Sequence, residues 1–123
     1  MYYQSYMRFR SLRTSLAVLA AGVSLAGCRA LPASKPAGLL TPEEARGAEV
    51  YRQACAKCHN PTNTRPLNGP GLQALTKVKS MPSGAPPTDE RLTQVILHGR
   101  QMMPGTPLDD GQLRDLLAYL HTL

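Results

Sequence analysis

The stretch of sequence that decides the fold is Cys55-Ala56-Lys57-Cys58-His59. It stands between a predicted helix over residues 42–54 and a segment, residues 59–87, that is rich in Pro, Gly and Asn. A segment of that length is long for a connection in a small domain, and it indicates a functional loop or a loop wrapped around a bound group. Two of the three cysteines of the chain belong to this motif.

Two cysteines separated by two residues and followed directly by a histidine form the C-x-x-C-H pattern of covalent c-type haem attachment. At a helix end, both thiols can reach the two vinyl groups on one edge of a porphyrin, and the adjacent histidine can swing beneath the ring to bind iron. Cys55 and Cys58 are therefore the predicted thioether residues of one haem c, and His59 is its predicted proximal ligand.

Three other interpretations of the motif fit the sequence less well. A redox dithiol requires a βαβ context and a thiolate at a helix N-terminus, whereas Cys55 follows a helix. A structural zinc site requires four ligands, and only the isolated His98 and His121 remain as partners. A disulfide between Cys55 and Cys58 would close a loop too short to stabilise the chain much.

The sequence from residue 41 onward predicts an all-α fold. Thr41 and Asp109 each begin a capping box, with Glu44 and Gln112 three residues later, and Pro42 suits the first helical position. Thr88 opens another amphipathic helix, and no segment alternates long enough to indicate a strand. Helices are predicted over residues 42–54, over 88–98 with Gly99 as the stop, and over 109–123, with a short helical turn at 72–78.

The composition points to a single domain that needs a stabilising group. The chain has 123 residues, of which 42% are hydrophobic and 18% charged, so two large domains and a wholly disordered chain are excluded. It has no Trp and one Phe, and four of its six aromatic rings lie within the first nine residues. A small domain so poor in large side chains usually needs a disulfide, a metal or a cofactor, and a buried haem would meet that need.

From residue 41 to the last residue, the sequence resembles the class I, small monohaem cytochromes c. Gly47 and Tyr51 precede Cys55 at four-residue steps, and Leu116 and Tyr119 lie three apart on the last helix. The resemblance implies that the first and last helices cross and that long loops wrap one haem. Gly47 would then allow the close approach of the last helix, while Tyr51 and Tyr119 fill the contact.

The resemblance also implies how the haem is held on both sides. In Gly69-Pro70-Gly71-Leu72, the carbonyl of Pro70 would accept the Nδ1 hydrogen of His59. Met103, followed by Pro104, would be the distal ligand, a soft neutral donor that raises the reduction potential relative to a second imidazole. The remaining candidates for the distal ligand are Met102, Met81 and His98.

The N-terminal region is predicted to be a targeting signal. Three arginines precede an apolar run over residues 16–26, and Leu25-Ala26-Gly27-Cys28 resembles the lipobox of bacterial lipoproteins. We expect a signal peptide at 1–27, a lipidated Cys28 with a flexible tether to residue 40, and a cytochrome c domain over 41–123. An ordinary secretory signal and a short membrane anchor are the alternatives, and a start at Met7 would give a more typical signal sequence.

The predicted function is electron transfer outside the cytoplasm. Three of the fourteen Lys and Arg precede residue 28, so the mature chain carries 11 basic and 8 acidic residues and a net charge of +3 rather than +6. No basic run in the mature chain suggests nucleic-acid binding. We expect a monomeric, non-enzymatic carrier, anchored to the bilayer through Cys28, that serves membrane redox complexes or other electron carriers. A peroxidase or gas sensor with a labile Met103, and a fixed haem subunit of a larger complex, are the alternatives.

Five cations would form either a docking rim for an acidic partner or a solvated surface: Lys57, Arg65, Lys77, Lys79 and Arg100.

Overall fold

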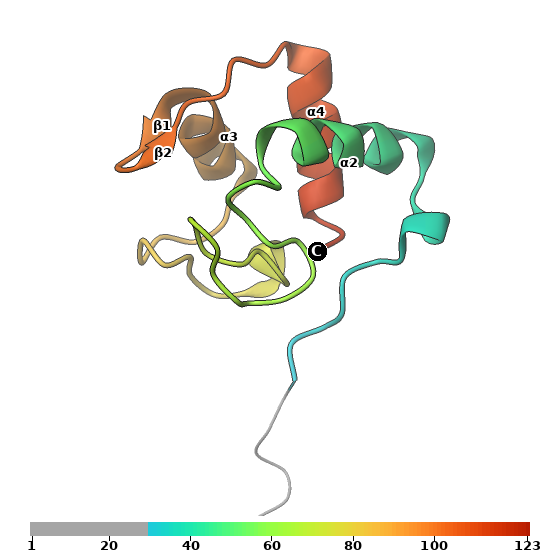
Figure 1. Ribbon diagram of the computed structural model, residues 1–123, viewed down its shortest axis with the longest axis horizontal. Coiled ribbons are helices and arrows are strands. Elements are labelled where there is room, and N and C mark those ends of the chain that lie inside the picture. The colour runs from blue at the N-terminus through green and yellow to red at the C-terminus, as the bar shows by residue number, and fades with distance from the viewer. Residues whose placement is uncertain (1–29) are drawn as a thin grey trace, which may run out of the picture. The chain divides into compact units, whose positions relative to one another are not determined.

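Two helices from distant parts of the sequence, α2 (Pro42–Ala54) and α4 (Asp110–Leu120), cross in the computed structural model, which describes residues 30–123 (Figure 1). A Cβ atom on Gly47 of α2 would lie 1.8 Å from the main-chain oxygen of Asp115, so only glycine fits the crossing. Beside it, the rings of Tyr51 and Tyr119 have centroids 5.3 Å apart. The expected close crossing and tyrosine contact are confirmed.

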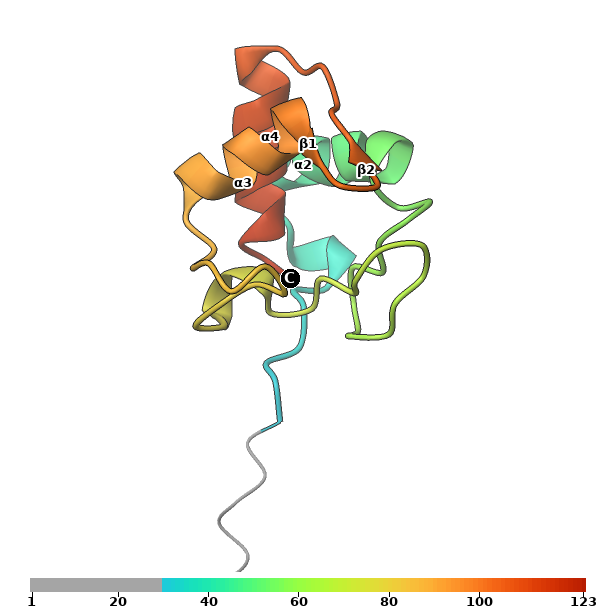
Figure 2. The same cartoon turned by 90° about the vertical axis from the view of Figure 1, so that its left-hand side faces the viewer.

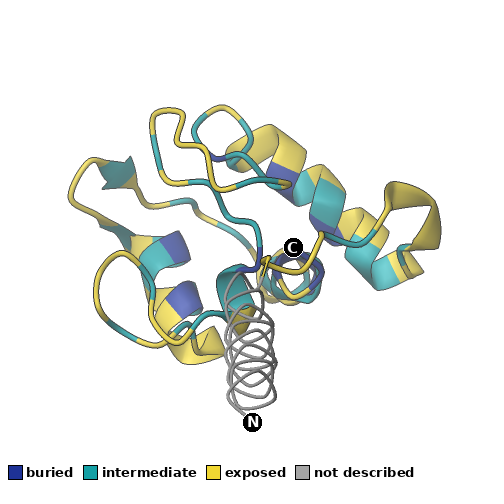
Figure 3. Ribbon diagram, turned by 90° about the horizontal axis from the view of Figure 1, so that it is seen from below, coloured by how far each residue is buried: buried dark blue, intermediate teal, exposed yellow. Residues whose placement is uncertain are grey.

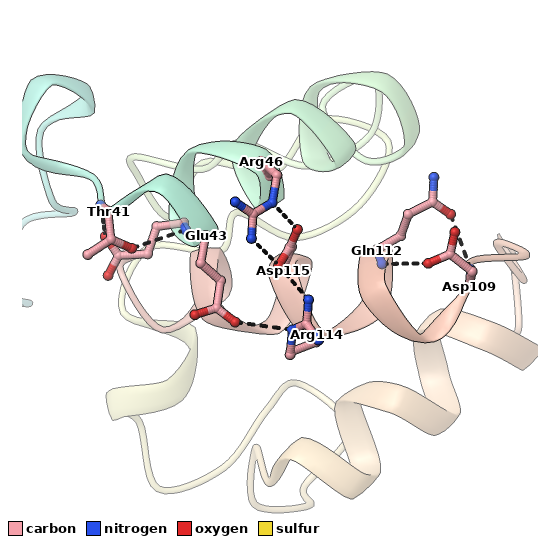
Figure 4. Close-up of polar contacts among 8 residues, drawn as sticks. Thr41, Glu43, Arg46, Asp109, Gln112, Arg114 and Asp115 are labelled. Carbon is pink, nitrogen blue, oxygen red and sulfur yellow. Dashed lines mark hydrogen bonds and ion pairs between the residues drawn. The ribbon is translucent and has the colours of Figure 1, made fainter.

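Local sequence signals place the helix ends. Glu44 N donates to Thr41 Oγ1 over 3.2 Å, and Thr41 N donates to Glu44 Oε2 over 2.7 Å, which is the capping box predicted for α2. The Asp109 and Gln112 pair caps α4 in the same way (Figure 4). The third helix, α3 (Asp89–His98), ends at Gly99 with φ of 77°. The predicted all-α class is confirmed, and the turn predicted at 72–78 is the shorter 3₁₀ helix η2 (Leu75–Lys77).

A small hairpin follows α3 that the sequence does not predict. Its strands are β1 (Gly99–Arg100) and β2 (Met103–Pro104), paired antiparallel with Arg100 opposite Met103. Two-residue strands are too short to show an alternating pattern. The reversal needs positive φ at Gly99 and at Gln101, whose φ is 52°. Gly99 is suited to its place, since a Cβ there would lie 2.5 Å from the Met103 carbonyl oxygen.

Ion pairs join α2 to α4 near the crossing. Arg46 donates from Nε and Nη2 to the two carboxylate oxygens of Asp115, over 2.6 and 3.1 Å, and Arg114 pairs with Glu43 at 3.3 Å (Figure 4). Asp115 is buried, and the hydrogen bond from Arg46 lowers the pKa of its carboxyl group. Position along one helix gives no sign of a partner on another, so the sequence does not predict this pair.

The segment before α2, expected to be a flexible tether, makes specific contacts with the domain. Lys35 N donates to the carbonyl of Thr122 over 2.7 Å, and Lys35 Nζ pairs with Glu44 at 2.6 Å. Ser34 donates to the Pro61 carbonyl over 3.0 Å, and Gln73 donates to the Pro32 carbonyl over 3.1 Å. A 3₁₀ turn, η1 (Ala37–Leu39), then leads into the N-cap of α2.

The helices and the loops occupy different ends of this unit. In Figures 1 and 2, the three helices lie in the upper part, and residues 60–80 (green to yellow) lie in the lower part, where the segment before α2 also runs. Figure 3, viewed from below, shows both exposed and partly buried stretches in these loops. The buried core is small: Tyr51, Leu92, Ile96, Leu116, Leu120 and Leu123.

Candidate haem site

A cavity of about 660 Å³ lies between the helices and the long loop. It receives side chains from α2, α3 and α4, from the loop that follows α2, and from the hairpin. Seven aliphatic side chains belong to the wall: Leu72, Leu75, Leu92, Val95, Ile96, Leu116 and Leu120. These are the apolar faces of the predicted helices together with two loop leucines, so the same residues that make the core also enclose the cavity.

His59 lies in the wall of this cavity with its tautomer fixed. Its side chain is buried, and its Nδ1 atom lies 2.8 Å from the carbonyl oxygen of Pro70. A carbonyl only accepts, so Nδ1 of the neutral ring carries the hydrogen, and Nε2 keeps a lone pair for a metal ion. Gly69 makes this placement possible, since a Cβ there would lie 2.5 Å from His59 Cε1. The hydrogen bond implied by the family resemblance is therefore present.

Cys55 and Cys58 also line the cavity, and both are half-buried free thiols. Cys55 is the C-cap of α2, and the amides of Cys58 and His59 both donate to its carbonyl over 3.0 Å. This turn brings all three side chains to one wall. Burial, with a smaller contribution from Cys58, raises the pKa of the Cys55 thiol to about 11. A thiol that stays protonated at neutral pH differs from the low-pKa thiolate of a redox dithiol.

Three methionines line the cavity: Met81, Met102 and Met103. Met102, at the tip of the hairpin, is 95% exposed, whereas Met81 and Met103 are half-buried. His98, the fourth candidate for a distal ligand, lies outside the cavity wall, and its Nδ1 is 3.2 Å from the Gln94 carbonyl. His121, at the C-cap of α4, pairs with Asp89 at 2.8 Å.

Tyr51 has a role at the site that the sequence analysis missed. It lines the cavity, and its hydroxyl donates to the carbonyl of His59 over 2.8 Å. Burial raises the pKa of Tyr51, so the hydroxyl keeps its proton and remains a donor. The family resemblance implied that Tyr51 lies in the helix crossing, where it does lie, but nothing in the spacing predicted a hydrogen bond to the residue eight positions later.

The residues present fit a covalently bound haem. A neutral imidazole nitrogen and thioether sulfurs are donors that suit haem iron. The wall supplies them together with two thiols and a lining of Leu, Val and Ile. Gly69 leaves room for the His59 ring, because a Cβ atom at this position would occupy the same space.

Comparison with known proteins identifies the family. Residues 42–120 match the family described as "Cytochrome C oxidase, cbb3-type, subunit III". This chain belongs to that family. The matched range begins at α2, ends with α4, and contains the C-x-x-C-H motif and the cavity. The chain therefore contains a c-type cytochrome domain, and its family implies haem c as cofactor.

A curated relative supports the same assignment. It is the "Cytochrome bc1 complex cytochrome c subunit" of Corynebacterium diphtheriae, which is 33% identical over 86 residues, or 68% of this chain. The match covers 28% of the relative, so the cytochrome spans less than a third of that protein's length.

The predicted signal peptide at 1–27 and lipidated Cys28 lie outside the described residues. Within residues 30–123, no helix combines the length and the apolar character needed to cross a bilayer.

Proposed function

We propose that this cytochrome is tethered to a membrane outside the cytoplasm and carries single electrons between redox partners through one haem c. The observation that supports this best is the cavity wall in which Cys55, Cys58 and His59 lie together, with the Nδ1 atom of His59 bonded to Pro70. Cys55 and Cys58 would form the thioethers and His59 would bind the iron. The bound haem supplies a centre that alternates between ferric and ferrous iron.

Pro70 and Tyr51 would hold the proximal ligand. The Pro70 carbonyl fixes which ring nitrogen of His59 carries hydrogen and strengthens the other as a donor. The Tyr51 hydroxyl holds the main chain of the same residue. Two hydrogen bonds from different segments therefore restrict how His59 moves, which keeps the reorganisation that accompanies each electron transfer small.

We assign the distal position to Met103. It lies on β2, which is held by its pairing with β1 and by the close approach of Gly99 to its carbonyl. Its side chain is half-buried in the cavity wall, whereas Met102 is almost fully exposed at the neighbouring position. Met81 shares the wall, so it is the rival that an experiment must exclude.

The test compares three holoprotein variants: Met103→Ala, Met102→Ala and Met81→Ala. Loss of the thioether ligand should lower the reduction potential and allow carbon monoxide to bind the reduced protein in Met103→Ala alone, because only that change opens the iron. Optical titration and carbon monoxide difference spectra measure both effects. Rapid carbon monoxide binding by the unaltered protein would instead indicate a peroxidase or gas sensor. A Met103→Ala spectrum identical to that of the unaltered protein would mean that another residue is the distal ligand.

The covalent attachments are testable in one measurement. Mass spectrometry of mature protein from a host that attaches haem to c-type cytochromes should find one haem on the peptide that contains Cys55 and Cys58. It should also find acyl chains on Cys28 as the first residue. Unmodified Cys55 and Cys58 would refute the haem proposal, and an unmodified or absent Cys28 would refute the tether.

A fixed haem subunit of a membrane oxidoreductase is the second candidate. The matched family and the curated relative are both described as subunits, of an oxidase and of a bc1 complex respectively. In that case the same haem would relay electrons without leaving its complex. Purification from detergent-solubilised membranes separates the two: a permanent subunit elutes in stoichiometric amount with the complex at high salt, whereas a tethered carrier elutes alone.

A further inference from the structure

The segment that precedes α2 is hydrogen-bonded to the domain only a few residues after Cys28, the proposed membrane anchor. Pro32, Ser34 and Lys35 make the hydrogen bonds described above to the loops and to the end of α4. Cys28 is four residues from Pro32, a span of at most about 14 Å at 3.6 Å per residue. A free chain from 28 to 40 would reach roughly three times as far. The fastened end of the domain must therefore stay beside any membrane that holds Cys28.

The loops at that end carry cations and no carboxylates. All eight Asp and Glu of the sequence lie in α2, α3 and α4 or at the N-cap of α4, and residues 50–88 contain none. Arg65, Lys77 and Lys79 are exposed in this stretch. Lys77 Nζ donates to the main-chain oxygen of Leu123 over 2.8 Å, whereas within residues 30–123 neither Arg65 nor Lys79 forms an ion pair. We call residues 31–35, 61–68 and 77–79 the loop face; they lie at the lower end of Figures 1 and 2.

Two large apolar side chains are exposed on the same face. Leu31 is 44% exposed and Leu67 is 56% exposed. Leu31 precedes Pro32, whose carbonyl is bonded to Gln73, and Leu67 lies in the loop that Ser34 holds at Pro61. On this face Lys35 is paired with Glu44, whereas Arg65 and Lys79 have no ion-pair partner among the described residues. Exposed leucines beside such cations resemble the composition of surfaces that lie at a lipid headgroup layer.

We propose that the loop face docks directly on a bilayer of anionic phospholipid, so that the acyl chain and the protein surface bind the same membrane. This rests on the proposed anchor at Cys28. The fastened segment keeps Arg65 and Lys79 near the headgroups, where the attraction of Lys and Arg to an anionic surface acts over a Debye length of about 8 to 10 Å. Leu31 and Leu67 enter the headgroup region. The domain therefore has one preferred orientation on the membrane.

The experiment uses the haem-loaded mature chain with Cys28→Ser, exported behind a cleavable secretory signal so that no acyl chain contributes. Cosedimentation with vesicles of phosphatidylglycerol and phosphatidylcholine measures the partition coefficient. Binding should require phosphatidylglycerol and weaken as salt rises. Adding Arg65→Gln and Lys79→Gln should reduce partition by about 25-fold, about fivefold for each cation. The matched control carries Arg91→Gln and Arg114→Gln, which remove the same charge from α3 and α4 and should leave binding nearly unchanged.

Three outcomes would overturn the proposal. The first is equal partition into phosphatidylcholine and phosphatidylglycerol vesicles. The second is an equal loss of partition in the control variant, which would indicate that binding depends on the net charge of the protein and not on the loop face. The third is vesicle binding that Arg65→Gln and Lys79→Gln leave unchanged while electron transfer from a purified membrane complex slows, which would assign these cations to a protein partner. Because the vesicle assay contains no acyl chain, its result is independent of whether mass spectrometry finds Cys28 acylated.

Discussion

Replacing Gly47 with alanine tests the helix crossing on which the site is built. The new Cβ would lie 1.8 Å from the carbonyl oxygen of Asp115 and 2.9 Å from Tyr119 Cβ. An ordinary C···O contact is about 3.3 Å, so α2 and α4 must separate by about 1.5 Å. A gap of 0.5 to 1 Å already removes a quarter to a half of the dispersion energy across a contact.

The expected magnitude follows from two opposing effects. Alanine has the better helix propensity, by about 1 kcal/mol. Overpacking a well-packed contact costs about 1 to 3 kcal/mol, and the clash with main-chain atoms puts Gly47→Ala at the upper end. We expect a net loss of about 2 kcal/mol in the free energy of unfolding. For a domain of this size, that corresponds to a fall of about 8 to 16 °C in Tm.

Thermal unfolding of the haem-loaded protein, followed by circular dichroism at 222 nm, measures this change. Gly38→Ala is the matched control, because a Cβ at Gly38 meets nothing within 4 Å and its φ is not positive. A Tm of Gly47→Ala equal to or above that of the unaltered protein would mean that helix propensity outweighs the clash. The close crossing of α2 and α4 would then be refuted.

Three further results are expected. The Arg46 hydrogen bond lowers the pKa of Asp115, so below about pH 5 the unfolded state binds more protons than the folded state, and the protein loses stability as the pH is lowered. In Asp115→Asn, the difference in Tm between pH 7 and pH 3.5 should therefore be smaller than in the unaltered protein, and equal differences would contradict this. A chain produced without haem maturation should be largely unfolded, since the aliphatic side chains that line the 660 Å³ cavity would then face water instead of a porphyrin, and the remaining core is small. A native-like helical spectrum would count against this. Gly69→Ala places a methyl group 2.5 Å from His59 Cε1 and should alter the absorbance spectrum or lower the holoprotein yield, whereas Gly38→Ala should do neither.

Features that depend on neighbouring residues were predictable from the sequence. The capping boxes at Thr41 and Asp109 and the stop at Gly99 gave helix boundaries close to the observed ones, because a cap acts within one turn. The motif at 55–59 placed two thiols and an imidazole together for the same reason. Family resemblance added what spacing alone does not carry, such as the contact of Gly47 with α4 and the bond from His59 to Pro70.

Features that join distant residues were not predictable. The bidentate pair of Arg46 and Asp115 spans 69 positions, and the bond from Lys35 to Thr122 joins the two ends of the described chain. A Pro- and Gly-containing segment such as 29–40 has no period of its own, so its hydrogen bonds depend on a surface that exists only after folding. The hairpin at 99–104 was missed because the backbone turns on a positive φ at Gln101, a residue type that rarely adopts it.

Tyr51 gives this protein an internal reporter. Its ring packs on Tyr119, and its hydroxyl holds the carbonyl of His59, so a shift of one helix against the other is transmitted to the main chain of the proposed iron ligand. The visible spectrum of the bound haem should then change before the helices melt. Mechanical or chemical stress on the crossing could be followed by colour alone, without any added label.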